Sequence, residues 1–450
     1  MREFDVLVVG TGSAGSTAAM MTRSQGRSVA IVDDRAYGGT CALRGCDPKK
    51  VLVGAASIVD DATRLVPLGA VDRAPVIDWP ALARFKRTFT DPVPPERERE
   101  YGAAGIVTLH GRARFDDPQT VRVGDERVRA GHVVIAAGAR PRHVADGDDA
   151  LLTSEQFLDL QALPGSLIFV GGGYIALEFA HVAARAGAKV TIVHAHDRVL
   201  SGFDPDVVER LVATTREIGI ELVLNAPVRA VAHVDGGIVV RATARGGQRE
   251  LRAEAGVLAA GRVADIDELA LDAGNVARTP RGIAVNAYLQ STSNPNVYAA
   301  GDAADGGALP LTPIAGYEGE IVAENILHGN RRTLDTAGLA NVVYTIPPLG
   351  TTGLTQQQAR ERGIDVEVHV GDMTSWYSSR RVAARGAYYK VVVETGSRTI
   401  AGATIFGPHA EEQINILALA VRAGLNADLV ASTLFAYPTG ASDLEYMLRS

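Results

Sequence analysis

Residues 4–15 read FDVLVVGTGSAG, an apolar run that ends in closely spaced glycines and continues into the small-residue stretch STAAMMTRSQG. This order predicts a strand, a glycine turn and a helix whose N-terminal N–H groups can face a pyrophosphate. The next apolar run, SVAIVDD, ends on Asp33, eighteen residues after Gly15. A dinucleotide-binding fold places an acid there to bind the adenosine ribose.

A second copy of this pattern begins about 160 residues later. SLIFVGGGYIALEFAHVAARAGAKVTIVHAHD repeats the strand, the glycine loop GGGYIA from Gly171 to Ala176, the helix and the next strand. One such loop is weak evidence in a chain with 48 glycines, but two copies in the same context are not ordinary turns. The chain is therefore expected to bind two dinucleotides, one held as a flavin and one exchanged as a nicotinamide.

Length and composition limit the function classes. The chain has 450 residues, 46% of them hydrophobic and 22% charged, which predicts a folded protein of several domains. A net charge of −7 provides no basic surface, so we expect no nucleic-acid partner. The charged start MREFD is typical of neither a signal peptide nor a membrane span, so we expect a cytoplasmic protein with no membrane contact.

The only two cysteines, Cys41 and Cys46, lie in GGTCALRGCDPKK. We expect them at the start of one helix, where a spacing of five brings the thiols together across the first turns. The helix N-terminus and the following Lys49 and Lys50 would stabilise a thiolate. The alternatives are an inert buried pair or half of a metal site, but no further ligands have zinc spacing, and we expect no metal.

These motifs, together with AAGARP, NVYAAGD and the terminal FAYPT, resemble the flavin-dependent pyridine nucleotide-disulfide oxidoreductases, the family of glutathione reductase, dihydrolipoamide dehydrogenase and mercuric reductase. The resemblance covers essentially the whole chain. It implies an α/β fold with two doubly wound dinucleotide-binding domains and an α+β C-terminal dimerisation domain. The implied boundaries are 1–145 for the first part of the FAD-binding domain, 146–262 for the NAD(P)-binding domain, 263–338 for the FAD-binding return and 339–450 for the interface domain.

The resemblance also implies roles for individual residues. Cys46 would contact the flavin and Cys41 would exchange with the substrate, while Lys49 would reach the flavin and pair with Glu178. Tyr174 would cover the nicotinamide pocket, and the partner chain of a homodimer would complete the active site with Tyr437. The catalytic candidates are thus Cys41, Cys46, Lys49, Glu178 and Tyr437. The expected cofactor-binding positions are Gly10, Gly12, Ser13, Ala14, Gly15, Asp33, Gly39, Thr40, Lys49, Ala137, Gly138, Gly171, Gly173, Tyr174, Ile175, His194, Gly261, Arg262, Gly301 and Asp302, with Asp33 on the adenosine ribose and Asp302 on the ribityl chain.

The sequence departs from that family pattern at three places. Tyr437 stands where disulfide reductases have a histidine, and Ser442 stands at the position of its glutamate partner. Met20 and Glu320 replace the arginines that hold glutathione carboxylates. The segment VHAHDRVL from Val193 lacks both the acid of NAD-specific members and the usual arginines of NADPH-specific ones. His194, His196 and Arg198 can accept a 2′-phosphate, which favours NADPH over NADH.

The expected activity is electron transfer from NAD(P)H through FAD and a Cys41–Cys46 disulfide to a small-molecule acceptor. The leading hypothesis is a disulfide reductase for an uncharged or apolar disulfide other than glutathione disulfide. The first alternative is a reductase of Hg(II), Cu(II) or a quinone, where no thiol leaving group needs a proton. The second alternative is a redox-sensing flavoprotein whose dithiol state changes its binding to a partner.

Overall fold

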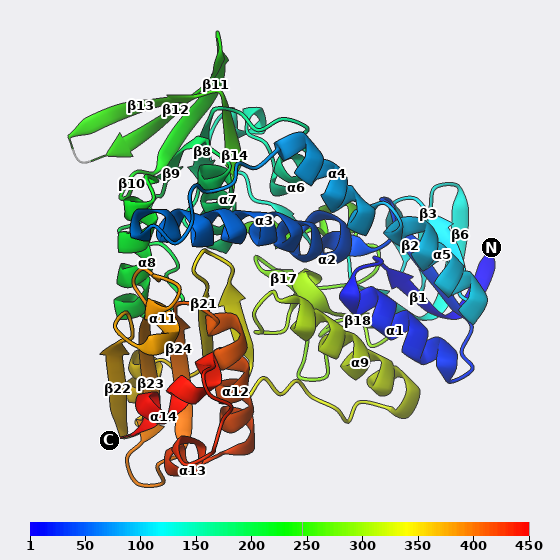
Figure 1. Cartoon of the computed structure of the whole chain (residues 1–450). Helices are drawn as coiled ribbons and strands as arrows, with labels where there is room; N and C mark the ends of the chain where they lie inside the picture. Colours follow the sequence, from blue (N-terminus) through cyan, green and yellow to red (C-terminus); the bar gives the residue numbers. More distant parts are fainter. Residues whose placement is uncertain (245, 450) are drawn as a thin grey trace. The chain divides into compact units, whose positions relative to one another are not determined.

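The computed structural model describes residues 1–244 and 246–449. The chain forms two compact units, each assembled from three separate segments (Figure 1). The first unit comprises residues 1–49, 84–142 and 261–335. The second unit comprises residues 50–83, 143–260 and 336–450.

A seven-stranded sheet with the order β3-β2-β1-β6-β5-β4, in which β18 also pairs with β6, is the centre of the first unit. β18, β6, β1, β2 and β3 pair in parallel, and β5 and β4 continue the sheet antiparallel. The apolar run Val6 to Val9 is buried, as expected for a parallel strand covered on both faces. The strands are β1 (Arg2–Val9), β2 (Val29–Asp33), β3 (Val107–His110), β4 (Ala113–Asp117), β5 (Thr120–Val123), β6 (Glu126–Ile135) and β18 (Val297–Ala299).

Helices α1 (Ser13–Ser24) and α9 (Thr312–His328) lie side by side in this unit (Figure 1). They can approach closely because Gly319 has no side chain. A Cβ atom added there would lie only 2.4 Å from the Ala14 carbonyl oxygen. The remaining elements that lie wholly in the unit are α2 (Gly39–Arg44), α5 (Val93–Ala104), β7 (Ala139–Pro141), β15 (Arg262–Ala264), η3 (Asp267–Leu269), β16 (Arg278–Thr279), β17 (Gly282–Ala284), η4 (Gly301–Ala303) and β19 (Ala304–Asp305).

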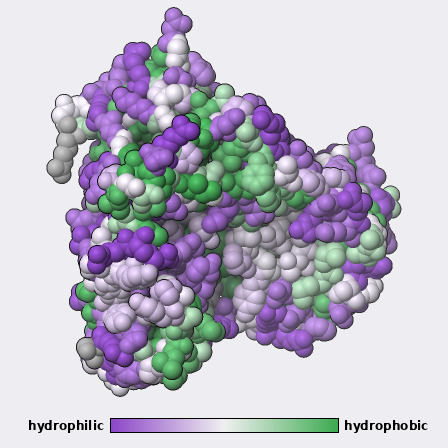
Figure 2. Space-filling model, in the orientation of Figure 1, coloured by the Kyte–Doolittle hydropathy of each residue, from purple (hydrophilic) through white to green (hydrophobic). Residues whose placement is uncertain are grey.

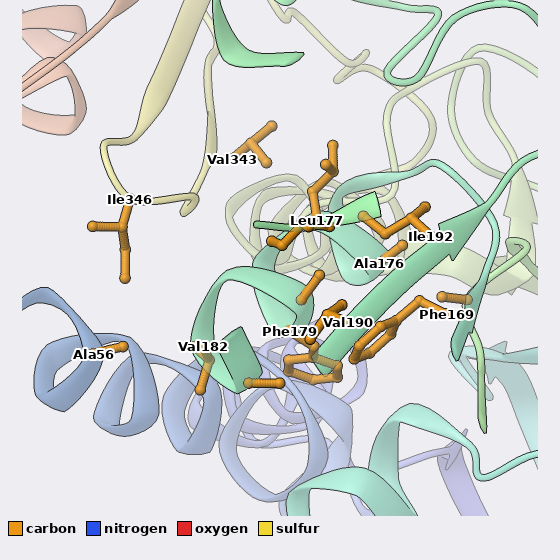
Figure 3. Packing of buried hydrophobic residues seen from close by; sticks show 14 of the residues in the cluster. Ala56, Phe169, Ala176, Leu177, Phe179, Val182, Val190, Ile192, Val343 and Ile346 are labelled. Atoms are coloured by element: carbon orange, nitrogen blue, oxygen red, sulfur yellow. The ribbon is translucent and has the colours of Figure 1, made fainter. Parts of the chain in front are cut away.

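The second unit contains the second glycine loop on a parallel sheet of order β10-β9-β8-β14. Helix α7 covers this sheet with an apolar face: Figure 3 shows Ala176 and Leu177 beside Ile192, and Phe179 beside Val190. The elements of this part are η2 (Asp148–Ala150), α6 (Ser154–Leu158), β8 (Ser166–Val170), α7 (Tyr174–Arg185), β9 (Lys189–Val193), α8 (Pro205–Glu217), β10 (Glu221–Val223), β11 (Val228–Val234), β12 (Gly237–Ala244), β13 (Gly247–Ala253) and β14 (Ala255–Leu258).

The C-terminal part of this unit is a five-stranded antiparallel sheet of order β20-β21-β24-β23-β22 with helices packed on it. The expected α+β architecture is confirmed here. Apolar side chains are exposed on α12, on α13 and in the segment that follows α13 (Figure 2). They include Leu419, Leu429 and Leu434. The elements are β20 (Ala340–Val343), β21 (Leu349–Gly353), α10 (Gln356–Glu361), β22 (Val366–Asp372), α11 (Tyr377–Arg380), β23 (Tyr388–Glu394), β24 (Ile400–Phe406), α12 (Ala410–Ala423), α13 (Ala427–Ala431), η5 (Gly440–Asp443) and α14 (Leu444–Leu448).

The expectation that both cysteines share one helix is wrong. Cys41 lies in α2, and Cys46 is the first residue of α3 (Cys46–Leu65), because Gly45 interrupts the helix with φ −147° and ψ −108°. The helical stretch after the cysteines continues through η1 (Val66–Leu68) and α4 (Trp79–Thr90) to α5. No helix among residues 1–244 and 246–449 is both long and apolar enough to cross a membrane.

Candidate functional site

The predicted FAD-binding residues converge because the strands that precede them end at one edge of the parallel sheet. Val9 is in register with Val32 and Ile135, and Ile135 with Ala299. The residues that follow, Gly10, Asp33, Ala137 and Gly301, therefore leave the sheet at the same edge. In open α/β sheets this carboxyl edge is where ligands bind.

The glycines of the first loop let neighbouring backbone approach so closely that a side chain would clash with it. Gly10 has φ +103°, and a Cβ atom there would lie 2.2 Å from the Ala136 carbonyl oxygen. Gly12 is the N-cap of α1, which begins with Ser13, Ala14 and Gly15. The segment that leads to Cys41 packs directly on this loop, because a Cβ atom at Gly39 would lie 2.3 Å from Gly12 Cα. Thr40 is the second residue of α2.

Asp33 is fixed at the end of β2 by hydrogen bonds to its carboxylate. Thr11 donates to Oδ2 from its backbone N at 2.9 Å and from its hydroxyl at 2.6 Å. The backbone N of Arg35 donates to Oδ1 at 3.0 Å. Thr11 therefore orients the predicted ribose-binding acid, a role that the sequence analysis missed although Thr11 lies inside the glycine loop.

Asp302 lies in η4, and a second carboxylate, that of Glu318, lies close to it. Burial raises the pKa of Asp302, and the Arg262 guanidinium opposes this effect. Glu318 of α9 is buried, and its Oε2 accepts a hydrogen bond from the backbone N of Gly301 at 2.6 Å. Burial raises the pKa of Glu318 to about 7, with Asp302 adding to the shift. Arg262, which follows Gly261 (φ +105°), donates from Nη2 to the Ala139 carbonyl beside the predicted Ala137–Gly138 loop.

The two cysteines form a free dithiol with unequal proton affinities. The Cys41 thiol hydrogen-bonds to Cys46, which raises the pKa of Cys41 and lowers that of Cys46. Thr312 Oγ1 lies 3.4 Å from Cys46 Sγ, and this hydrogen bond lowers the pKa of Cys46 further, as does the Lys49 ammonium. Cys46 is therefore the thiolate of the pair, and Cys41 carries the shared proton.

Thr312 is the second residue that the sequence analysis missed. It is the first residue of α9, and the side chain of the N-cap residue, Leu311, makes no capping hydrogen bond. The helix thus presents its positive end and a hydroxyl beside Cys46, 266 residues away in the chain, and both features stabilise a thiolate. The motif LTPIAGYEG marks a helix start but gives no indication of which residue it faces.

The second glycine loop has the same construction in the second unit. β8, β9 and β14 are parallel and end in register at Val170, Val193 and Leu258, so Gly171 and His194 share one edge. Gly173 is the N-cap of α7, and Tyr174 and Ile175 begin the helix, with Tyr174 38% exposed.

His194 is already engaged within this unit. Its ring packs against Gly172, and its Nε2 hydrogen-bonds to the Arg198 carbonyl oxygen at 3.1 Å. Burial lowers the pKa of His194, so the imidazole is neutral at pH 7. Its neighbour His196 lies with its ring centroid 5.3 Å away. Arg198 therefore supplies a permanent positive charge near this strand end.

Glu178 is not a surface carboxylate. It lies on the buried face of α7, only 1% exposed, and its Oε1 accepts a hydrogen bond from the Tyr344 backbone N at 2.7 Å. Glu178 is therefore not a solvated residue of the helix surface. The pairing of Glu178 with Lys49 stays a prediction.

Tyr437 is 74% exposed, and its ring centroid lies 6.2 Å from that of Tyr377. Ser442, at the position of the family glutamate, hydrogen-bonds through Oγ to the Thr439 carbonyl oxygen at 2.6 Å. Its hydroxyl closes a local turn and does not contact Tyr437. Within the part of the chain that the structure describes, no group of three or more His, Cys, Asp or Glu residues is arranged to hold a metal ion.

Comparison with known proteins gives matches along the whole chain. Residues 4–319 match the model of the pyridine nucleotide-disulphide oxidoreductases, and residues 339–448 match the dimerisation domain of the same family. Dihydrolipoyl dehydrogenase of Halobacterium salinarum is 32% identical over 451 residues, covering 97% of this chain and 93% of the relative. Mercuric reductase of Streptomyces lividans is 32% identical over 457 residues, covering 98% and 95%. The Cu(II) complex of the HOCl-induced flavoprotein disulfide reductase RclA from Escherichia coli superposes with a TM-score of 0.88 at 26% identity, covering 100% of this chain and 99% of RclA.

Proposed function

Because the chain belongs to the pyridine nucleotide-disulfide oxidoreductase family, whose members are FAD enzymes that use NAD(P)H, we propose that it reduces a small disulfide other than glutathione disulfide. The observation that carries this proposal is the polarised dithiol: Cys46 as the thiolate beside Thr312 and Lys49, and Cys41 as the protonated thiol. A dithiol with one nucleophile and one bound proton is suited to exchange with a disulfide.

The residues of the first unit fit FAD. The N-cap of α1, Gly12, makes no side-chain capping hydrogen bond, so the backbone N–H groups of the first turn would bind a pyrophosphate, Asp33 would bind the adenosine ribose, and Asp302 would bind the ribityl chain. When bound, the flavin would supply the hydride-accepting and two-electron chemistry that links NAD(P)H to the cysteine pair. The Lys49 ammonium stabilises negative charge on Cys46.

The exchange itself balances on the two cysteines. Cys41 transfers its proton and attacks one sulfur of an acceptor RSSR, forming a Cys41–SR mixed disulfide. The Cys46 thiolate then attacks Cys41 Sγ and expels the second RS group. The net products are the Cys41–Cys46 disulfide, one RSH and one RS⁻, so two electrons and one proton leave the dithiol.

Three positions argue against glutathione disulfide as the acceptor. Met20 and Glu320 provide no guanidinium for its carboxylates, and Glu320 lies 3.3 Å from the Arg332 guanidinium. Each missing charge-assisted contact costs about 1.5–3 kcal/mol. Tyr437 also puts a phenol, which is a weaker general acid than an imidazolium, where disulfide reductases have a histidine.

We further propose that NADPH is the preferred reductant. Burial keeps His194 neutral, so Arg198 is the charged group that would bind the 2′-phosphate of NADPH.

The exposed Tyr437 and the apolar side chains Leu419, Leu429 and Leu434 support a homodimer in which Tyr437 reaches the partner's dithiol. A dimeric site of this kind would be lost on dilution to the monomer.

Reduction of a metal ion such as Hg(II) or Cu(II) is the second candidate. The support is the similarity to a mercuric reductase and to RclA in its Cu(II) complex, together with two thiol ligands, which favour soft ions such as Hg(II) and Cu(I). The test is NADPH consumption by the purified protein with neutral disulfides, Cu(II), Hg(II) and quinones in parallel. Turnover with a neutral disulfide supports the first proposal. Turnover confined to metal ions or quinones would overturn it.

A further inference from the structure

A carboxylate lies beside Cys41, the thiol of the pair that is proposed to meet the acceptor. Asp47 follows Cys46 in the first turn of α3, and its Oδ1 lies 4.0 Å from Cys41 Sγ. The Asp47 residue is exposed, so its charge faces both the thiol and the solvent from which an acceptor arrives. The exchange reaction proposed above uses Lys49 and Thr312 but assigns nothing to Asp47.

The charges around the dithiol are arranged asymmetrically. Lys49 stabilises negative charge on Cys46, whereas Asp47 disfavours negative charge on both sulfurs. Thr312, the third group at the dithiol, is uncharged. The positive group thus acts on the thiol assigned to the flavin, and the negative group contacts the thiol assigned to the acceptor.

We propose that Asp47 is a specificity-determining residue that selects cationic electron acceptors over anionic ones at Cys41. The acceptors it favours are disulfides that carry ammonium groups and divalent metal cations. The inference rests on the proposed function in that it takes Cys41 as the thiol that meets the acceptor. A unit charge held about 4 Å from another changes an association constant by about fivefold in bulk water, and by more where solvent is partly excluded.

The first experiment measures kcat/KM with NADPH for three aliphatic disulfides that differ in charge: cystamine (dication), 2-hydroxyethyl disulfide (neutral) and 3,3′-dithiodipropionate (dianion). In the wild type we expect cystamine to be preferred over dithiodipropionate, and Asp47→Asn to reduce that ratio by about tenfold or more. Asp47→Glu should retain the preference. Asp61→Asn is the matched control, because Asp61 is a second exposed acid of α3 with a side chain 62% exposed.

Salt gives a second signature in the same assay. The cystamine preference of the wild type should fall between 10 mM and 500 mM NaCl, since exposed charges are screened, and the Asp47→Asn ratio should stay flat. A ratio that is the same in the wild type and Asp47→Asn would overturn the inference, while turnover of hydroxyethyl disulfide by both proteins would leave the proposed function intact.

A reagent assay tests Asp47 even where no disulfide is turned over. The dithiothreitol-reduced holoprotein is alkylated with iodoacetate, which is anionic, or iodoacetamide, which is neutral, and modification of Cys41 is followed by mass spectrometry. We expect Asp47→Asn to raise the iodoacetate-to-iodoacetamide rate ratio at Cys41 by about fivefold, with Asp61→Asn equal to the wild type. An unchanged ratio would refute the role of Asp47 independently of the acceptor. Absence of disulfide turnover together with a raised ratio would refute the proposed function alone.

Discussion

The hydroxyl of Thr312 lies 3.4 Å from the sulfur of Cys46. Its donated hydrogen bond stabilises the thiolate, and hydrogen bonds to charged groups contribute about 1.5–3 kcal/mol. Thr312→Val should therefore raise the pKa of the Cys46 thiol by about one to two units. The pH dependence of Cys46 alkylation in a Cys41→Ser background measures this shift.

Thr312→Ser is the control for that experiment, because it keeps the hydroxyl and removes only a methyl group. It should titrate close to the parent protein. Equal titration of the Val and Ser variants would show that the hydroxyl makes no contribution to the thiolate.

Glu318 makes the stability of the protein depend on pH. Burial raises its pKa from 4.5 to about 7, so the folded state binds this proton more tightly than the unfolded state does. The stabilisation is complete below pH 4.5 and is lost as pH rises through about 7, with a magnitude of ~3 kcal/mol. Urea unfolding at pH 5 and pH 8 should show this loss in the wild type, whereas Glu318→Gln, which still accepts from Gly301, should lack it. The same loss in Glu318→Gln would assign the pH dependence to other groups.

The close approach of Gly39 to Gly12 predicts a severe effect of one added methyl group. Gly39 has φ +71°, and its Cβ atom would lie 2.3 Å from Gly12 Cα. Gly39→Ala should therefore displace the glycine loop and yield protein with little bound FAD, measured as the 450 nm to 280 nm absorbance ratio. Gly54→Ala is the matched control, because Gly54 lies in α3 with open space at its Cβ position. It should keep full flavin content and gain about 1 kcal/mol of helix stability.

We expect substitutions at Tyr437 and Ser442 to have non-additive effects on disulfide turnover. Tyr437→His supplies a better acid, but the Ser442 hydroxyl is engaged with Thr439 and cannot orient the ring. Tyr437→His should raise disulfide turnover by less than the ~10²–10⁴ that a general acid supplies, and adding Ser442→Glu should raise it further. A double variant no faster than the wild type in NADPH consumption would show that no acid at position 437 assists the exchange.

The sequence predicts the elements whose signals are local. Both glycine loops, the acid Asp33 at the end of β2, and the antiparallel C-terminal sheet follow from periodicity and turn residues within short segments. The fold class and family follow from these motifs, because each one is read from contiguous residues. The expected fold is confirmed by the sheets and by the family match.

The parts that could not be predicted depend on tertiary contacts. Thr312 contacts Cys46 although 266 positions separate them in the chain. Neither sequence segment indicates that the two residues are neighbours. Glu178 is buried because α7 covers the sheet with its apolar face and Tyr344 N binds the carboxylate. The helix break at Gly45, which puts the cysteines on two helices, is a backbone property that thiol spacing does not encode.

We propose that Cys46 is the thiolate beside the flavin and that Cys41 is the thiol that meets the acceptor. The most direct measurement is the visible spectrum of the FAD-loaded protein after limited reduction with NADPH. We expect a long-wavelength charge-transfer band near neutral pH in the wild type, its loss in Cys46→Ser and its presence without reduction in Cys41→Ser. A band that survives in Cys46→Ser and disappears in Cys41→Ser would contradict the assignment of the two thiols.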